Sequence, residues 1–202
     1  MKEQDTGMSL LEIKNLYHTF SDGTHALRGV NFLVKKDDFL VISGKNGSGK
    51  TVMLRHLNGL YTPTSGKVLF QGKSVQTQIR TVRQNIGLVF QDADSQIVSQ
   101  TLWDDVAFGP VNLKFSQEKI RQTVEKSLKS VGLWSLKDHS PHKLSGGEKR
   151  KLAIAGVLAM EPRIILLDEP FSNLDYPGIV EILKQILKLH QIGHTIICVT
   201  HE

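Results

Sequence analysis

The sequence of 202 residues has one cysteine, no long apolar run and little excess of charge. Because Cys198 is the only cysteine, no disulfide can form within the chain, and its apolar setting, TIICV, indicates a buried structural thiol. No apolar run reaches the roughly 18 residues that a membrane-spanning helix needs. The N-terminal MKEQDTGMSL lacks the apolar core of a signal peptide. These absences argue against a disulfide-stabilised secreted protein or an integral membrane protein, and we expect a cytoplasmic location.

The net charge is only +5, from 25 basic and 20 acidic residues spread along the chain. The densest basic cluster is GEKRKL, residues 147–152. A solvated helix face, or attraction to nucleotide or anionic lipid, explains such a cluster better than nucleic-acid binding does. We therefore expect no nucleic acid among the partners.

Short apolar runs alternate with segments of helical periodicity, which is typical of an α/β fold with a mainly parallel sheet. We expect an antiparallel flank from the N-terminal strands, and a helical subdomain at about 91–160 inserted in a single domain, 1–202. A Gly-Pro pair indicates short helices in 101–115. The expected strands are 10–20, 30–34, 38–43, 67–70, 85–91, 163–169 and 194–201, and the expected helices are 50–59, 178–190 and those beginning after Ser116 and Ser145.

The segment GKNGSGKT, Gly44 to Thr51, follows an expected strand and precedes an expected helix. In this context it matches a phosphate-binding loop and indicates a P-loop NTPase core. Backbone N–H groups from Asn46 to Lys50 would surround the phosphates, and three glycines would allow the tight turn. The Lys50 ammonium would contact the β- and γ-phosphates, and the Thr51 hydroxyl would bind Mg²⁺. The glycines of the loop are Gly44, Gly47 and Gly49, with Ser48 between the last two.

The segment RIILLDEP places two acids at the end of an apolar strand. A buried strand can deliver Asp168 to the metal, and Glu169 would then face the attacking water. Two solvated acids at a strand end are the alternative, which the nearby phosphate loop disfavours because Mg²⁺ needs a second protein ligand.

The segment LSGGE begins the next expected helix, and Ser145 and Glu148 have the spacing of a capping box. The cap accounts for the serine and the glutamate. It does not account for Gly146 and Gly147, which make the loop harder to order. These glycines would let a phosphate approach, as a second phosphate-contacting loop in the chain.

Taken together, these motifs resemble those of the ATP-binding subunits of ABC transporters. GKNGSGKT resembles the Walker A motif, IILLDE the Walker B motif and LSGGE the family signature; VFQD, SNLD and Thr200-His201 resemble the glutamine loop, the D-loop and the switch histidine. They occur in the family's order across nearly the whole chain. The resemblance implies an ATPase whose turnover drives transport at the cytoplasmic face of the membrane, with ATP and Mg²⁺ as its ligands.

The resemblance also implies roles for individual residues. Two such domains, identical or not, would pack head to tail, so that Ser145, Gly146 and Gly147 read the partner's ATP and Asp175 crosses the interface. Glu169 and His201 would act on the attacking water. Gln91 would link Mg²⁺ and water to a transmembrane partner. Either Phe20 or Tyr17 would stack on adenine.

A narrower resemblance, carried by residues 89–113 and 152–175, is to the energy-coupling ATPases of importers for vitamins and metals such as cobalt, nickel and biotin. It implies a transmembrane coupling protein and a substrate-binding membrane subunit as partners, with Asp94, Gln96 and Ile97 facing the coupling protein. Because residues 96–98 mix polar with apolar character, we expect them to form the docking segment. The resemblance also implies that a helix and further strands follow the switch histidine, so we expect part of the family domain to be missing after Glu202. A soluble ABC ATPase of another class and a non-catalytic nucleotide-binding regulator are the alternatives.

Overall fold

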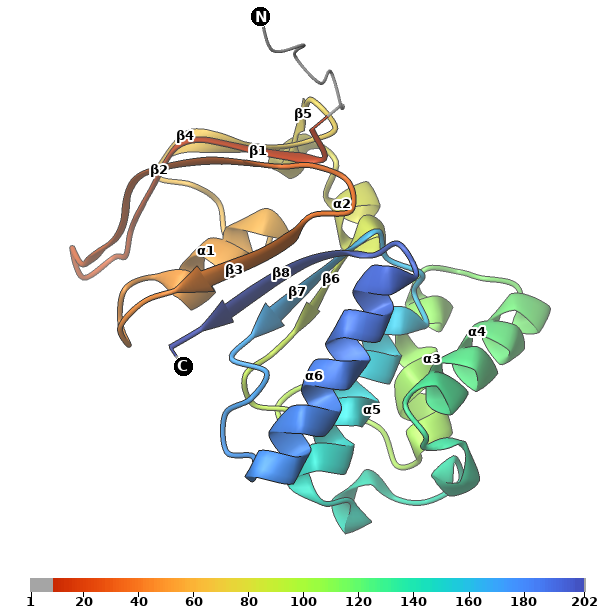
Figure 1. Cartoon of the computed structure of the whole chain (residues 1–202). Coiled ribbons are helices and arrows are strands. Elements are labelled where there is room, and N and C mark those ends of the chain that lie inside the picture. Colours follow the sequence, from red (N-terminus) through yellow and green to blue (C-terminus); the bar gives the residue numbers. More distant parts are fainter. Residues whose placement is uncertain (1–8, 202) are drawn as a thin grey trace, which may run out of the picture.

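The chain folds into two β-sheets with helices packed against them (Figure 1). This computed structural model describes residues 9–201. Most of the N-terminal segment in which we expect no signal peptide, residues 1–8, lies outside the described residues. The α/β class predicted from the sequence is confirmed.

The N-terminal strands form an antiparallel sheet in the order β2-β1-β4-β5. Its inner face carries alternate buried residues such as Leu11, Ile13 and Leu16, which pack in one cluster with Leu54 of the helix beneath. The predicted antiparallel flank is therefore confirmed. Its strands are β1 (Leu11–Thr19), β2 (His25–Val34), β4 (Ser65–Phe70) and β5 (Lys73–Ser74).

The second sheet is parallel, in the order β3-β8-β7-β6. Every residue of its last three strands is buried, as expected where helices or another sheet cover both faces. Alternate residues serve two cores: Ile165 and Leu167 face one cluster, and Ile164 and Leu166 the other. The strands are β3 (Phe39–Ser43), β6 (Ile86–Val89), β7 (Ile164–Asp168) and β8 (Thr195–Thr200).

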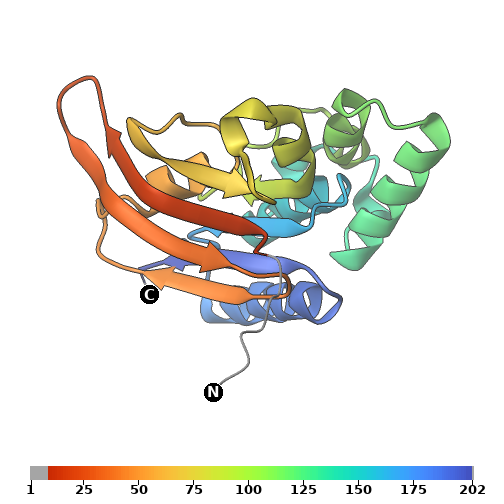
Figure 2. The ribbon, with the colours of Figure 1, turned by 90° about the horizontal axis from the view of Figure 1, so that it is seen from above.

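Helices cover the two faces of the parallel sheet unequally (Figure 1). Helix α1 lies between the two sheets, whereas α3 to α6 share the core on the opposite face. Viewed from above, the β1–β2 hairpin and α4 lie at opposite ends of the molecule (Figure 2). The helices are α1 (Lys50–Leu57), α2 (Ile79–Asn85), α3 (Leu102–Asn112), α4 (Gln117–Ser130), α5 (Gly146–Leu158) and α6 (Tyr176–Gln191), with 3-10 turns at Val75–Thr77, Trp134–Leu136 and Pro141–Lys143.

The prediction of short helices in 101–115 is wrong, because α3 is one continuous helix. Thr101 caps it by accepting a hydrogen bond from the Asp104 N–H at 3.1 Å. Pro110 lies in its last turn, and the preceding Gly109 has no Cβ to clash with the proline ring. An added Cβ on Gly109 would lie 2.7 Å from Met160 Cγ, so the glycine also lets α3 approach the end of α5 closely.

A buried histidine lies on α1, beneath the antiparallel sheet. His56 is 0% exposed, and neither of its ring nitrogens has a hydrogen-bond partner. Burial, followed by the charge of neighbouring His18, lowers the pKa of His56 from 6.5 to about 4, and a polar interaction with the Tyr61 backbone, too poorly aligned for a hydrogen bond, opposes part of the fall. The unfolded chain therefore binds this proton more readily than the folded chain does.

We expect the folded chain to lose stability as the pH falls from 6.5 towards 4. Above pH 6.5 His56 is neutral in the folded and the unfolded chain, so the stability of the fold is not reduced. As the pH falls from 6.5 through the folded pKa, the unfolded chain binds the proton more readily, and this part of the stability is lost. The loss is at most about 3 kcal/mol, at about 1.4 kcal/mol per pKa unit. Thermal midpoints across this range should fall less steeply for His56→Leu than for wild type, whereas His142→Leu, at an exposed site, should keep the wild-type slope. Equal slopes for wild type and His56→Leu would contradict the assignment.

Candidate functional site

The loop between β3 and α1 folds around the ammonium group of Lys50. Lys50 Nζ donates to the carbonyl oxygens of Gly44 at 2.6 Å and Lys45 at 3.2 Å. Gly49 has φ +90°, and an added Cβ would lie 2.4 Å from Ala26 O on β2, so no other residue fits this point. The intervening Asn46, Gly47 and Ser48 are exposed, with their backbone accessible to a ligand.

Parallel pairing brings the acids of β7 to the same edge of the sheet. In the register, Asp168 of β7 lies opposite Val199 of β8, next to the Ser43–Thr200 pair that precedes the loop. The Thr51 hydroxyl donates to Asp168 Oδ1 at 2.9 Å. Burial raises the pKa of Asp168, the hydrogen bond from Thr51 opposes this rise, and neighbouring Glu169 adds to it.

Glu169 lies at the centre of the cluster, between a lysine and a histidine. Its Oε1 is 3.4 Å from Lys50 Nζ, and its Oε2 is 2.7 Å from His201 Nδ1 and accepts the His201 N–H at 3.2 Å. Both Lys50 and Glu169 side chains are less than 10% exposed, so their charges interact with little screening by water. The backbone of Glu169 has φ 46°, and its N–H donates to Val199 O at 3.0 Å. For a non-glycine residue this left-handed conformation costs about 1–3 kcal/mol, and it occurs at functional sites as well as in turns elsewhere in this chain.

The Thr51–Asp168 pair supplies the oxygen ligands that Mg²⁺ uses beside substrate phosphates. Mg²⁺ is typically held by one or two protein oxygens, with water and phosphate completing its octahedron. A hydroxyl and a carboxylate oxygen 2.9 Å apart fit that requirement. Nowhere in residues 9–201 do three or more His, Cys, Asp or Glu side chains converge as a metal-binding group.

The LSGGE segment forms the predicted capping box at the start of α5. Glu148 N–H donates to Ser145 Oγ at 3.3 Å, and Glu148 Oε2 accepts from Ser145 N at 2.8 Å. This bond from the Ser145 N–H lowers the pKa of Glu148. An added Cβ on Gly146 or Gly147 would meet no atom of the chain within 4 Å, so packing within the chain does not require these glycines. The start of α5 lies away from α1 and its loop (Figure 1).

The other predicted site residues are Gln91, Asp175 and the two aromatic candidates for adenine stacking, and they lie at separate places in the fold. Gln91 is exposed, two residues after β6 ends. Asp175 caps α6, because its Oδ1 accepts a hydrogen bond from the Gly178 N–H at 3.0 Å. This capping role is structural, and a contact across an interface would be a second role for the same residue.

The two aromatic candidates for adenine stacking differ in what surrounds them. Tyr17 covers Gly29 of β2, where an added Cβ would lie 2.8 Å from the phenolic oxygen. Phe20 is 37% exposed at the end of β1, its ring centroid 4.7 Å from that of His18. Tyr17 is 44% exposed, so both rings have a free surface to offer a ligand, and only Phe20 packs against His18.

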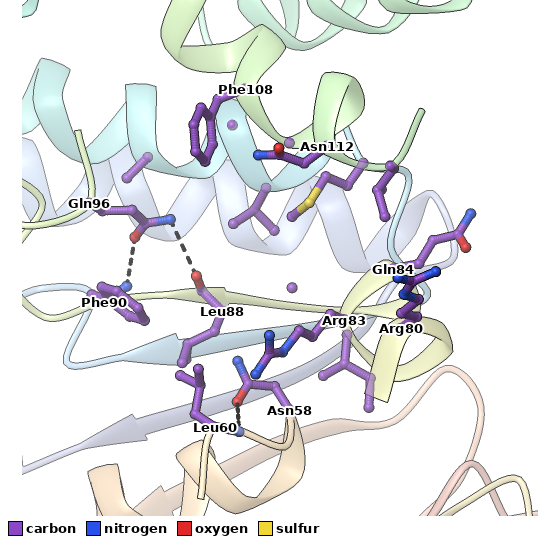
Figure 3. Close-up of a pocket in the computed structure, with 18 of the residues that line it drawn as sticks. Asn58, Leu60, Arg80, Arg83, Gln84, Leu88, Phe90, Gln96, Phe108 and Asn112 are labelled. Atoms are coloured by element: carbon purple, nitrogen blue, oxygen red, sulfur yellow. Dashed lines mark hydrogen bonds between the residues drawn. The ribbon is translucent and has the colours of Figure 1, made fainter. Parts of the chain in front are cut away.

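A groove of about 810 Å³ separates α3 and α5 from the segment around α2. Figure 3 shows Phe108 and Asn112 on one side and Asn58, Leu60 and Arg83 on the other. Gln96 lines the groove, but its side-chain amide already has hydrogen-bond partners within the chain. Its Oε1 accepts from the Phe90 N–H at 2.9 Å, and its Nε2 donates to Leu88 O at 3.3 Å.

Of the expected docking segment 96–98, only part faces this groove. Val98 lines the groove and is 65% exposed. Ile97 is half-buried and packs against the core shared by α3 and α5. A charge at Ile97 would therefore destabilise the fold, and Val98 and Phe108 are the better residues with which to probe this surface.

The sequence matches the model of the ABC transporter family over residues 27–172. The chain belongs to this family. It is 44% identical over 198 residues to the energy-coupling factor transporter ATP-binding protein EcfA of Methanocaldococcus jannaschii, covering 96% of this chain and 71% of the relative. It is 47% identical over 193 residues to the EcfA of Carboxydothermus hydrogenoformans, with 95% and 72% coverage.

A solved structure agrees with the sequence relatives. The structure of cbiO1 from Clostridium perfringens, described as part of the ABC transporter complex cbiONQ, matches with a TM-score of 0.86 at 42% identity. The match covers 96% of this chain and 79% of the other. The chain is thus an ABC ATPase of the energy-coupling factor type, a subunit that binds ATP and hydrolyses it to drive transport.

The sequence reasoning missed an arginine that joins two motifs of this ABC ATPase. The basic cluster at 147–152 is expected to be a solvated face or to attract nucleotide or anionic lipid, and the solvated face is wrong for Arg150, because it is 4% exposed. Its Nη1 donates to Phe90 O at 2.6 Å, next to Gln91, and Lys149 pairs with Asp94 at 2.6 Å. Helix α5, which carries the signature, is therefore tied to the glutamine loop. No local pattern shows this, since only the fold brings the segments together.

We predict that Glu169→Gln retains ATP binding and loses at least about 100-fold in turnover. The amide keeps the size of the side chain and leaves the phosphate loop intact, but it cannot accept a proton from water. ATP affinity and phosphate release measured on the same preparation would test this. The control Glu161→Gln changes a half-exposed glutamate paired with Lys119 and should retain both properties. Near-normal hydrolysis by Glu169→Gln would refute the role.

Proposed function

We propose that this ABC ATPase powers the import of a vitamin or a transition-metal micronutrient at the cytoplasmic face of the membrane. The relatives named as energy-coupling factor transporter ATP-binding proteins and the cbiONQ structure support a role in transport, and the substrate class follows from the family resemblance of residues 89–113 and 152–175. In residues 9–201, no helix combines the length and hydropathy needed to cross a membrane. The proposal also includes two membrane partners, a transmembrane coupling protein and a substrate-binding subunit, as the resemblance to energy-coupling ATPases implies.

The observation that carries the catalytic proposal is the buried carboxylate between an ammonium and an imidazole. Glu169 lies within 3.4 Å of Lys50 and 2.7 Å of His201. In the proposed mechanism the γ-phosphate of ATP lies at Lys50, beside the carboxylate. Glu169 then accepts a proton from the attacking water, and His201 holds the carboxylate and the water in place. Asn46, Ser48 and the loop glycines hold the phosphates through backbone N–H groups.

Mg²⁺ would be held by Thr51 and Asp168, with Gln91 approaching it from the end of β6. When bound, it neutralises charge on the phosphate oxygens. The short contact between the Thr51 hydroxyl and Asp168 Oδ1, 2.9 Å, supports this assignment. On this proposal the exposed Gln91 would link this site to the segment that follows it, residues 92–98.

We propose that two copies, or this chain and a second ABC ATPase, share their ATP sites. The start of α5 lies away from its own phosphate loop (Figure 1). An added Cβ on Gly146 or Gly147 would meet no atom within 4 Å, so there is open space at this point. A partner's ATP would fill that space, with Ser145 and the helix N-terminus at its γ-phosphate. The exposed Asp175 lies at the start of α6, where it would cross the same interface.

We predict that mixing Lys50→Ala chains with Ser145→Arg chains restores activity that neither variant has alone. A mixed pair holds one composite site with both defects and one with neither, so up to about half of the pairs have an intact site. ATPase activity of each variant, and of the mixture after exchange of subunits, gives the measurement. Mixing two batches of Lys50→Ala is the control. If the mixture stays inactive while exchange is demonstrated, either one intact site is insufficient or the shared-site proposal is wrong. A demonstrably monomeric wild-type sample with full activity would reject it directly.

We propose that the groove lined by α3 and α5 receives the transmembrane coupling protein. The groove is large, partly apolar and bordered by the residues that follow Gln91. On this proposal residues 91–160, which contain α3, α4 and α5, act as a helical subdomain inserted in a single domain, 1–202. The tie from Arg150 to Phe90 O would pass movement of the subdomain to the Mg²⁺ site.

We predict that Val98→Asp and Phe108→Asp abolish co-purification with the transmembrane coupling protein and leave ATP binding intact. Both side chains are more than half exposed, so a charge leaves the fold unstrained but must be desolvated in the docked complex. Ile192→Asp is the matched control, because Ile192 is 64% exposed and lies outside this groove. Undiminished co-purification of both groove variants would contradict the docking site.

A further inference from the structure

A column of rings connects helix α1 to the end of strand β1. His18 lies at its centre and stacks nearly parallel on Tyr61, with ring centroids 5.2 Å apart and an angle of 3°. The ring of Phe20 meets His18 edge-on at 4.7 Å. His56 of α1 meets it from another side at 4.8 Å. Phe20 is thus the outermost ring of a packed stack.

The stack is anchored to the rest of the fold. Arg55 Nη1 donates to the Tyr61 hydroxyl at 2.8 Å, and its guanidinium carbon lies 5.5 Å from the centre of that ring. Arg55 and His56 are consecutive residues near the end of α1, the helix that begins at Lys50 and Thr51. The rings are therefore fixed to the helix that carries the phosphate-binding side chains.

The two histidines leave buried polar atoms unpaired. His18 Nδ1 and both ring nitrogens of His56 have no hydrogen-bond partner. Each unpaired buried polar atom costs about 1–3 kcal/mol, and apolar side chains of similar volume would avoid that penalty. The planar rings of the stack are therefore kept together at some cost in stability.

The outer end of the stack adjoins the phosphate loop. Phe20 N donates to Thr24 O at 2.9 Å, which closes the turn between β1 and β2. Two residues further on, Ala26 O lies against Gly49 of the loop, where an added Cβ would be 2.4 Å away. A nucleotide with its phosphates in the loop would have its base on this side, within reach of Phe20. Tyr17 is also exposed, at 44%, but its phenol packs over Gly29 and no ring contact joins it to the stack within the described residues.

We propose that His18 is the positioning residue for the nucleotide base: it fixes the ring of Phe20 as a platform for a purine and links that platform, through Tyr61 and His56, to α1. The inference rests on the proposed role of Phe20 in base stacking. Stacking needs a ring held at one orientation, because a ring free to rotate must be ordered when the ligand binds. The stack supplies that order before ATP arrives.

The test compares ATP with tripolyphosphate, which has the phosphates and lacks the base, by calorimetry on the full chain. His18→Ala should weaken ATP binding by about tenfold, as loss of aromatic stacking does, and leave tripolyphosphate binding unchanged. His18→Phe should restore ATP binding because a planar ring returns. Phe20→Ala should weaken ATP alone, and combining it with His18→Ala should add little, because the two residues act as one unit.

Equal losses for ATP and tripolyphosphate in His18→Ala would overturn the proposal, since that result describes general damage to the fold. If His18→Ala does not fold, His18→Leu keeps the volume without the planar ring, and the same selective loss is expected. Full ATP affinity in either folded variant, with Phe20→Ala impaired, would overturn the role of His18 and leave the base platform intact. Full ATP affinity in Phe20→Ala would reject the platform itself, and the proposed ATPase function, which does not depend on Phe20, would stand.

Discussion

The alignment of three neighbouring parallel strands is the constraint on which the site depends. β3, β8 and β7 end at the same edge, with Ser43 opposite Thr200 and Asp168 opposite Val199. The phosphate loop, the two acids and His201 follow these strand ends directly. A shift of one residue in any strand would turn its side chains to the opposite face of the sheet. The fully buried, β-branched residues of β7 and β8 oppose such a shift, because both faces are packed.

The same edge concentrates charge where water is scarce. Asp168, Glu169 and Lys50 lie together with little exposure, and each carboxylate has a hydrogen-bond or ion-pair partner within the cluster. A buried charge without a partner would be strongly destabilising. These partners lower the energetic cost of burying the two carboxylates: Thr51 donates to Asp168, and His201 pairs with Glu169. The contacts that stabilise the buried carboxylates are thus the same contacts that place them for ligand binding.

Local patterns predicted most of this arrangement. The capping box of Ser145 and Glu148 and the loop–helix junction at Lys50 depend on residues within a few positions of each other, so the sequence contains the whole interaction. The continuous helix α3 was missed because the Gly-Pro pair looks like a break, and the relief that glycine gives before proline was overlooked.

Other parts of the site depend on contacts that no local pattern records. Arg150 reaches Phe90 across 60 positions, and His18 stacks on Tyr61 from a different element. Within its own segment, Arg150 is one of three consecutive basic residues, and only the packing of α5 on the parallel sheet buries it. The groove has the same origin, since its walls come from several elements that meet only in the fold.

The single thiol of the chain, Cys198 of β8, lies near the ends of the parallel strands, and its environment makes it unreactive. Cys198 is 3% exposed, and burial together with Glu169 and Asp168 raises its pKa to about 12. The thiolate is the species that reacts with maleimides and disulfides. At neutral pH almost none of Cys198 is in that form, and the folded chain shields it from reagents. The natural sequence therefore serves as an unreactive background, in which a cysteine introduced at an exposed position carries a fluorophore or spin label without removal of the native one.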